Sequence, residues 1–143
     1  MPRLSQIMLR TALIWIAVGY TVGALVLFNK GVPFWAWLWL WRSAHVHLLL
    51  VGWLVQFAAG MAFWILPRLD AHGSRGNERL VWASYILLNA GVILAALHDP
   101  LVAIAPTLTR VMSVGAGGCY TLAAALFALH AWRRVVSFRT FPR

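Results

Sequence analysis

The chain has little charge: only three of its 143 residues are acidic, and charged residues make up 10% of it. Hydrophobic residues make up 62%, and the mean hydropathy is +0.79. About one quarter of an ordinary globular chain is charged, so this composition excludes a soluble globular domain. The single cysteine, Cys119, excludes a disulfide within the chain.

Four long apolar runs follow one another, and each is close to the roughly 20 residues that a bilayer span needs. We therefore predict an all-α integral membrane protein, a four-transmembrane-helix bundle that forms one domain over residues 1–143. The first run is expected to be retained, because no small-x-small cleavage pattern follows it cleanly. The helices are predicted at about 7–28, 43–66, 80–98 and 107–132.

The net charge of +9 would favour nucleic-acid binding in a soluble protein. Here most basic residues lie in the tails and connections, where they are expected to set membrane topology instead. Nine lie in the N-terminus, the second connection and the C-terminus, and three lie on the other side. Both termini are therefore predicted to be cytoplasmic, in a bacterial-type inner (cytoplasmic) membrane that the chain crosses several times. The nine are Arg3, Arg10, Arg68, Arg75, Arg79, Arg133, Arg134, Arg139 and Arg143, and the three are Lys30, Arg42 and Arg110.

This topology sorts the five histidines into two groups. His45, His47 and His98 lie at outer ends of helices, whereas His72 and His130 lie on the cytoplasmic side and are expected at the surface. At 100° per residue, His45 and His47 point in nearly opposite directions. His45 is predicted to face the bundle, and His47 to face lipid or a neighbouring subunit.

Small residues share the faces of the two inward histidines. Gly52 lies seven residues after His45, and Gly91 lies seven residues before His98, which is about 10 Å along each helix. This spacing predicts a flat gap for a porphyrin, with His45 and His98 as axial ligands of heme b near the outer face. Gln56 also lies on the His45 face, although an amide there is most simply a helix-packing hydrogen bond.

Two arginines lie near the same end of the predicted bundle. Arg42 precedes His45 by three residues, and Arg110 lies near the outer end of the fourth helix, on a face of small residues. Both are predicted to pair with the heme propionates. As an alternative, His45, His47 and His98 could hold copper or zinc, although the i, i+2 spacing makes His45 and His47 poor joint ligands.

Two other patterns have open interpretations. Gly19 and Gly23 form a Gly-x-x-x-Gly pair that permits close helix contact, although such pairs are common by chance. Four tryptophans alternate before the second helix and are typical of an interfacial anchor, or else form the lip of a ligand site. They are Trp35, Trp37, Trp39 and Trp41.

Residues 40–80 contain Arg-x-x-His, a glycine in mid-helix and a terminal Pro-Arg. The residues are Arg42, His45, Gly60, Pro67 and Arg68. This pattern resembles the second transmembrane helix of heme-copper oxidase catalytic subunits, most closely the nitric oxide reductase and related oxidase branches. The resemblance implies that His45 is an axial ligand of a low-spin heme on the outer side of the membrane.

The chain also departs from that family. It is one arc of helices long, whereas the family's catalytic subunit has three. The late helix that supplies the second ligand is missing, so His98 or a histidine of a second copy would take this role. The histidines for copper and high-spin heme are absent too, so no complete oxidase or reductase is implied.

The sequence therefore predicts a membrane b-type cytochrome with bis-histidine ligation, as a homo-oligomer in membrane lipid. It would pass electrons between a quinol or a periplasmic carrier and a partner, or sense a diatomic gas. The alternatives are a heme-handling or oxidase-assembly protein, and a membrane protein that binds copper or zinc.

Overall fold

The computed structural model describes residues 1–69 and 75–135, and within these ranges it contains helices and no strand. Four helical segments are long and apolar enough to cross a membrane, which suggests a multi-pass membrane protein. Three of them are α1 (Arg3–Gly31), α4 (Glu78–Leu101) and α5 (Pro106–Trp132). The remaining segment, Ala36–Ile65, consists of η1 (Ala36–Leu40), α2 (Trp41–His47), η2 (Leu48–Val55) and α3 (Gln56–Ile65).

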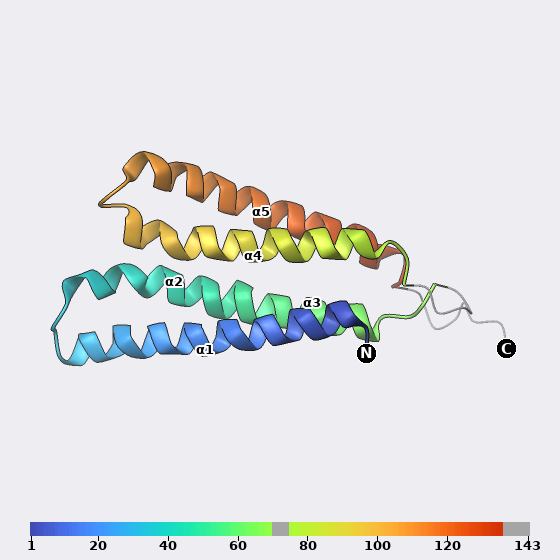
Figure 1. Ribbon diagram of the computed structural model, residues 1–143, viewed down its shortest axis with the longest axis horizontal. Coiled ribbons are helices and arrows are strands. Elements are labelled where there is room, and N and C mark those ends of the chain that lie inside the picture. Colours follow the sequence, from blue (N-terminus) through green and yellow to red (C-terminus); the bar gives the residue numbers. More distant parts are fainter. Residues whose placement is uncertain (70–74, 136–143) are drawn as a thin grey trace.

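These segments form two helical hairpins (Figure 1). α1 pairs with the rod α2–η2–α3, α4 pairs with α5, and the same rod also packs against α4. The N-terminus lies at the end of the molecule where α5 also ends, and the turns of both hairpins lie at the opposite end. The four predicted helices are confirmed, and the rod has a packed neighbour on each of two sides.

The rod changes its helix type along its length. η1 is a 3-10 helix, α2 and α3 are α-helices, and η2 between them is a π-helix. A π turn contains more residues than an α turn, so each residue contributes less rotation about the axis. Counting 100° per residue from a side chain before η2 therefore gives the wrong face for side chains after it.

The end of α4 differs from the prediction. The sequence predicts that this helix ends at His98, before Asp99 and Pro100, but α4 continues to Leu101 with Pro100 in its last turn. Proline lacks an N–H and costs a helix one hydrogen bond, and this loss matters least where the helix is about to end. The amide of Val102 closes the turn by donating to the Asp99 carbonyl at 3.3 Å. His98 and Asp99 are therefore both held on a helix.

Two amide side chains, one half-buried and one fully buried, tie the two hairpins together. Asn89 of α4 accepts a hydrogen bond from Trp15 Nε1 of α1 at 2.7 Å, and its Nδ2 donates to Gln56 Oε1 at 2.8 Å. Gln56 is fully buried, and it also donates to the Met8 carbonyl at 3.1 Å. Polar groups inside an apolar bundle need such internal partners. Gln56 thus serves helix packing in this fold.

One buried arginine closes the end of the molecule near the N-terminus. Arg134 follows α5 and is only 1% exposed. Its guanidinium donates to the carbonyls of Leu66, Pro67 and Phe63 at 2.6, 3.0 and 3.1 Å. The last carbonyls of a helix have no partner within it, so Arg134 caps α3 from a distant part of the sequence.

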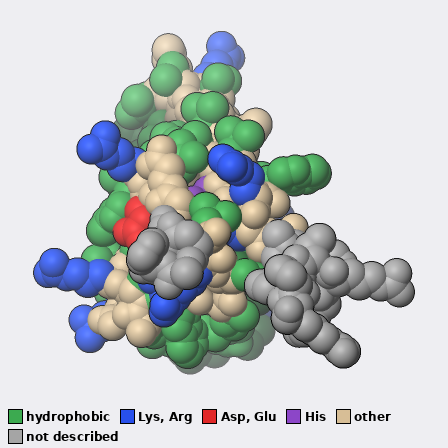
Figure 2. Space-filling view, turned by 90° about the vertical axis from the view of Figure 1, so that its right-hand side faces the viewer, with side chains coloured by type: hydrophobic (Ala, Val, Ile, Leu, Met, Phe, Trp, Pro, Cys, Tyr) green, Lys and Arg blue, Asp and Glu red, His purple; other side chains and the backbone are tan. Residues whose placement is uncertain are grey.

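His130 belongs to the same cap. Its Nε2 accepts from Arg134 Nη1 at 3.1 Å, and its Nδ1 donates to the Asn77 carbonyl at 3.2 Å. His130 is buried, so the expectation of a surface histidine is wrong at this position. Burial lowers the pKa of Arg134, and the positive charge of Arg75 lowers this pKa further. Figure 2 shows other arginine side chains exposed around this end of the molecule.

Candidate functional site

His45 lies against α1 and does not face α4. Its Nδ1 is 2.8 Å from the Gly19 carbonyl oxygen, which accepts a hydrogen bond from it. Its ring also packs closely on Gly23, where an added Cβ would stand 2.5 Å from Nδ1. In the Gly-x-x-x-Gly pair of α1, Gly23 therefore makes room for the imidazole, and Gly19 makes room for Leu49 and supplies the carbonyl. This pair is the sequence signal for the close contact.

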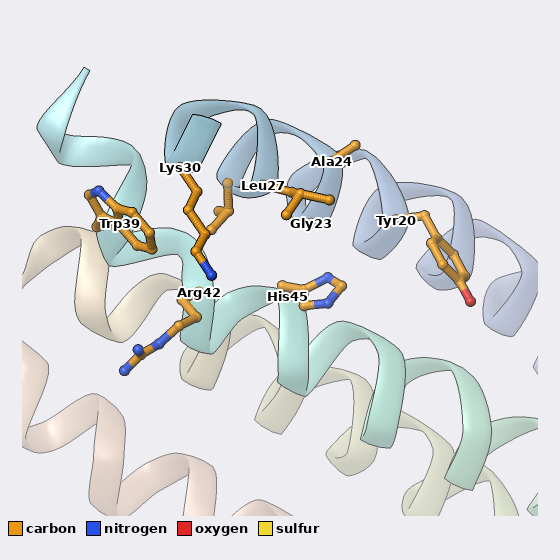
Figure 3. A pocket seen from close by; sticks show the side chains of 9 residues that line it. Tyr20, Gly23, Ala24, Leu27, Lys30, Trp39, Arg42 and His45 are labelled. Carbon is orange, nitrogen blue, oxygen red and sulfur yellow. The ribbon is translucent and has the colours of Figure 1, made fainter. Parts of the chain in front are cut away.

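A pocket of about 480 Å³ opens beside this imidazole between α1 and the start of the rod. Its walls are mostly apolar, and Figure 3 shows His45 beneath Gly23 with Tyr20 farther along α1. We call it the His45 pocket. Its lining residues are Tyr20, Gly23, Ala24, Val26, Leu27, Lys30, Trp39, Arg42 and His45.

Two cations belong to this pocket, and both lie toward the hairpin turn. Arg42 stands one turn before His45 in α2, and Lys30 stands near the end of α1 (Figure 3). Within residues 1–69 and 75–135, neither has a carboxylate partner. Arg42 was predicted as part of the site, whereas Lys30 was not, because α1 was not expected to contribute to it. The pocket therefore combines one imidazole, two unpaired cations and apolar walls.

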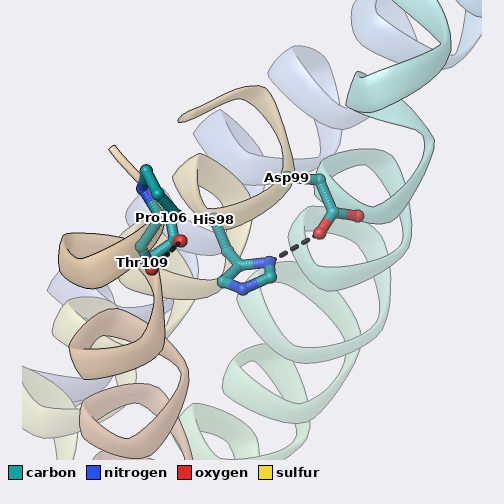
Figure 4. A network of polar contacts seen from close by, with 4 residues as sticks. All are labelled: His98, Asp99, Pro106 and Thr109. Carbon is teal, nitrogen blue, oxygen red and sulfur yellow. Dashed lines mark hydrogen bonds and ion pairs between the residues drawn. The ribbon is translucent and has the colours of Figure 1, made fainter. Parts of the chain in front are cut away.

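His98 lies in a different pocket. Its Nδ1 is 2.6 Å from Asp99 Oδ1, a pairing seen in Figure 4 beside Pro106 and Thr109 of α5. This second pocket has a volume of about 280 Å³, and we call it the His98 pocket. It is lined by Ser43, His47, Ala95, His98, Ser113, Ala116, Gly117 and Tyr120. The two pockets share no residue, so the structure does not bring His45 and His98 together.

The flat gap predicted between the two histidines is filled by aromatic rings. A Cβ added at Gly52 would stand 2.9 Å from Trp15 Cγ, and one added at Gly91 would stand 2.7 Å from Tyr120 Cδ1. Both glycines do allow a flat group to approach the helix, as predicted. The groups that use this space are the chain's own side chains, from α1 and α5.

Two further predicted residues lie elsewhere than expected. His47 does not face lipid: it lines the His98 pocket, and its Nδ1 is 3.4 Å from the Tyr120 hydroxyl. The sequence predicts that His47 shares a face with Leu50 and Leu54, and both leucines are exposed. The π-helix η2 begins directly after His47, so His47 does not share their face. Arg110 was expected to face inward and is exposed on α5, so it contributes to neither pocket.

The part of the chain that the structure describes contains no group of three or more His, Cys, Asp or Glu side chains that could hold a metal ion. His45, His47 and His98 in particular do not form one cluster. His72, Arg139 and Arg143 lie outside the described residues. No protein-family model, curated protein or solved structure matches the chain.

Proposed function

We propose that the chain is a membrane protein that binds a b-type heme in the His45 pocket, with His45 as an axial ligand. The observation that carries this proposal is the hydrogen bond between His45 Nδ1 and the Gly19 carbonyl. A carbonyl only accepts, so the proton is on Nδ1 and the lone pair of Nε2 is free for iron. Metal-binding histidines are typically oriented by such a second hydrogen bond. The heme would supply one-electron redox chemistry.

The remaining walls of the pocket suit the rest of a heme. A volume of about 480 Å³ is in the range of cofactor pockets, and the apolar side chains of α1 match a porphyrin face. Lys30 and Arg42 suit the two propionates, since each is a cation without a carboxylate partner among the described residues. The hydrogen bond to Gly19 fixes the His45 ring before heme binds. The two cations would orient the heme so that its propionates point toward the hairpin turn.

The pocket provides one axial ligand and leaves the other side open. His45 is its only lining residue with an imidazole or a sulfur atom. Tyr20 is 59% exposed and Leu27 is 69% exposed, so the pocket opens at the surface of the molecule. Ligation by both His45 and His98 would require Trp15 and Tyr120 to leave the glycines on which they pack. A heme held by His45 would therefore have its other side open to a diatomic gas or to a side chain of a second copy.

The charge pattern orients this site in the membrane. In the sequence, nine basic residues belong to the N-terminus, the second connection and the C-terminus, eight of them besides the buried Arg134, and three belong to the side of His45. Basic flanks stay in the cytoplasm, so both termini are cytoplasmic and the His45 pocket lies near the outer face. A heme there is within reach of a quinol in the bilayer or of a carrier outside it. We assign the chain to the cytoplasmic membrane of a bacterial-type cell.

Heme handling is the second candidate function, and the open side of the pocket favours it. A carrier must release heme to another protein, whereas a cytochrome retains it. Mixing the heme-loaded protein with apomyoglobin separates the two functions. Transfer within minutes supports a carrier, and retention for hours supports a cytochrome.

Gly23→Ala tests the close approach of α1 to the imidazole. The added Cβ would overlap the His45 ring, so the ring must move and its hydrogen bond to Gly19 is lost. Losing the hydrogen bond from the ring nitrogen that does not bind the metal typically lowers metal affinity about 10–100-fold. We expect a fall of this size in heme affinity, measured by titrating heme into the apoprotein and following the reduced α band.

Gly117→Ala is the matched control, because a Cβ at this exposed position on α5 meets nothing within 4 Å. We expect it to bind heme like the unchanged protein. Carbon monoxide added to the reduced protein reports the second axial position. A spectral shift shows that this position is open, and no shift shows that a second side chain occupies it. If Gly23→Ala binds heme as tightly as Gly117→Ala, the His45 pocket is not the heme site.

A further inference from the structure

The His98 pocket lies between α2, α4 and α5, and it differs in chemistry from the His45 pocket. Polar groups converge on it from all three helices, which is unusual for a site among apolar segments. His47 and Ser43 come from α2, His98 comes from α4, and Tyr120 and Ser113 come from α5. Intramembrane imidazoles that meet in a cavity mark a binding site more often than a packing contact.

Asp99 determines which nitrogen of His98 is available. Its carboxylate accepts the proton of Nδ1 at 2.6 Å, so Nε2 has a free lone pair. Figure 4 shows Nε2 on the side of the ring away from Asp99. Within residues 1–69 and 75–135, Nε2 has no hydrogen-bond partner. His98 therefore offers one strong acceptor to a ligand in the pocket.

The opposite wall offers donors. The Tyr120 hydroxyl and His47 Nδ1 are 3.4 Å apart, and their rings are stacked with centroids 6.1 Å apart. A hydrogen bond at 3.4 Å is long, so either group can turn to a ligand at little cost. The small side chains Ala95 and Ala116, together with Gly117, leave room for a flat ring between these polar groups.

Several kinds of ligand do not fit this arrangement. The pocket has no lysine or arginine in its lining, so it does not suit a phosphate or carboxylate. Its histidines do not belong to any group of three metal-ligating side chains in the described ranges. Ser113 and Gly117 are exposed on α5, so the pocket is open on the side that would face lipid. A ligand that enters there needs an apolar part.

We infer that the His98 pocket binds the head group of a lipid-soluble hydroxylated aromatic ring, of the benzoquinol class. One ring hydroxyl donates to His98 Nε2, and the oxygen on the other side of the ring meets Tyr120 and His47. The inference concerns binding alone and does not rest on heme, because the two pockets share no residue. It assigns a function to Asp99, which is one of only three acidic residues in the chain.

The test uses the full chain in detergent micelles and a benzoquinol with a decyl tail, with its quinone form, which has no hydroxyl to donate, as a second probe. Isothermal titration gives the affinity of each protein. His98→Leu removes the acceptor, and we expect affinity for the quinol to fall at least about 10-fold. Tyr120→Phe keeps the ring on Gly91 and removes one hydroxyl, and we expect a fall of about 2–10-fold. Circular dichroism checks that each variant remains helical.

His45→Ala is the control, because it alters the other pocket and should bind the quinol unchanged. It also distinguishes this inference from the heme proposal: each pocket should lose only its own ligand. Equal quinol affinities of all the variants would show that the probe only partitions into the micelle, and they would overturn the inference. Binding of Zn²⁺ alone that depends on His98, together with a quinol affinity that His98→Leu leaves unchanged, would also overturn it.

Discussion

His45→Ala is expected to abolish stable heme binding, lowering affinity by more than about 100-fold. The outer hydrogen bonds of a metal-ligating histidine are worth about 10–100-fold, and the ligand itself should be worth more. Loss of the imidazole also leaves the Gly19 carbonyl without its partner and opens space beneath Gly23. The measurement is the absorption spectrum of the purified protein after heme is added, with and without reductant. A b-type α band in the unchanged protein should be absent from the variant.

His98→Ala is the control for this experiment, and it decides between two interpretations. The sequence predicts that His98 is the second axial ligand, whereas the structure places it in a separate pocket beside Asp99. We expect His98→Ala to retain heme with an unchanged spectrum. If both variants lose the α band of bound heme, the sequence-based pair is right, and the helices rearrange around heme. If both retain it, the His45 pocket has no function in heme binding.

The four helices could be predicted from the sequence because the length of an apolar run is a property of the run alone. The confirmed segments follow the predicted ones closely, and the differences are at their ends. α1 begins at Arg3 rather than near residue 7, since nothing in the first turn stops a helix. α4 runs through Pro100 because a proline in the last turn interrupts little.

The site was only partly predictable, because helical phase shows which residues share a face but not which neighbour that face meets. The face of His45 turns toward Gly19 and Gly23 of α1, whereas the sequence predicts that it meets the helix of His98. The neighbour is α1, since the rod packs between α1 and α4 and has two inner faces. His47 lies on the second inner face of the rod, the face that meets α4 and α5. The π-helix η2 begins directly after His47 and changes the angle between successive side chains, so the residues that follow do not continue this face. A π-helix of this kind leaves no clear pattern in the residues.

Long side chains were the hardest to place from sequence. Lys30 and Arg42 lie in different segments, and only the hairpin brings both to the His45 pocket. The sequence predicts Arg134 to be one of nine topology-setting charges, yet it is buried. A guanidinium can reach several carbonyls that have no partner, and these carbonyls carry no signal in the sequence. Both cases depend on tertiary contacts between residues far apart in the chain.

Arg134→Met should cause the largest loss of stability among single substitutions at this end of the protein. Methionine keeps much of the buried volume, but the carbonyls of α3 and its end lose every donor that Arg134 supplies. A buried acceptor without a partner costs about 1–3 kcal/mol. Because some of these carbonyls can recruit water, we expect the free energy of unfolding to fall by about 3 kcal/mol. Unfolding in mixed micelles with increasing SDS, followed by circular dichroism, gives this quantity.

Arg133→Met is the matched control, since Arg133 is the adjacent residue and is exposed. It removes the same charge, so a purely electrostatic contribution would affect both variants alike. We expect its free energy of unfolding to change by less than about 0.5 kcal/mol. Arg134→Lys should be intermediate, because an ammonium cannot reach carbonyls on both sides as a planar guanidinium does. If Arg134→Met and Arg133→Met are equally stable, the cap on α3 contributes nothing, and the end of α5 is held by its apolar contacts alone.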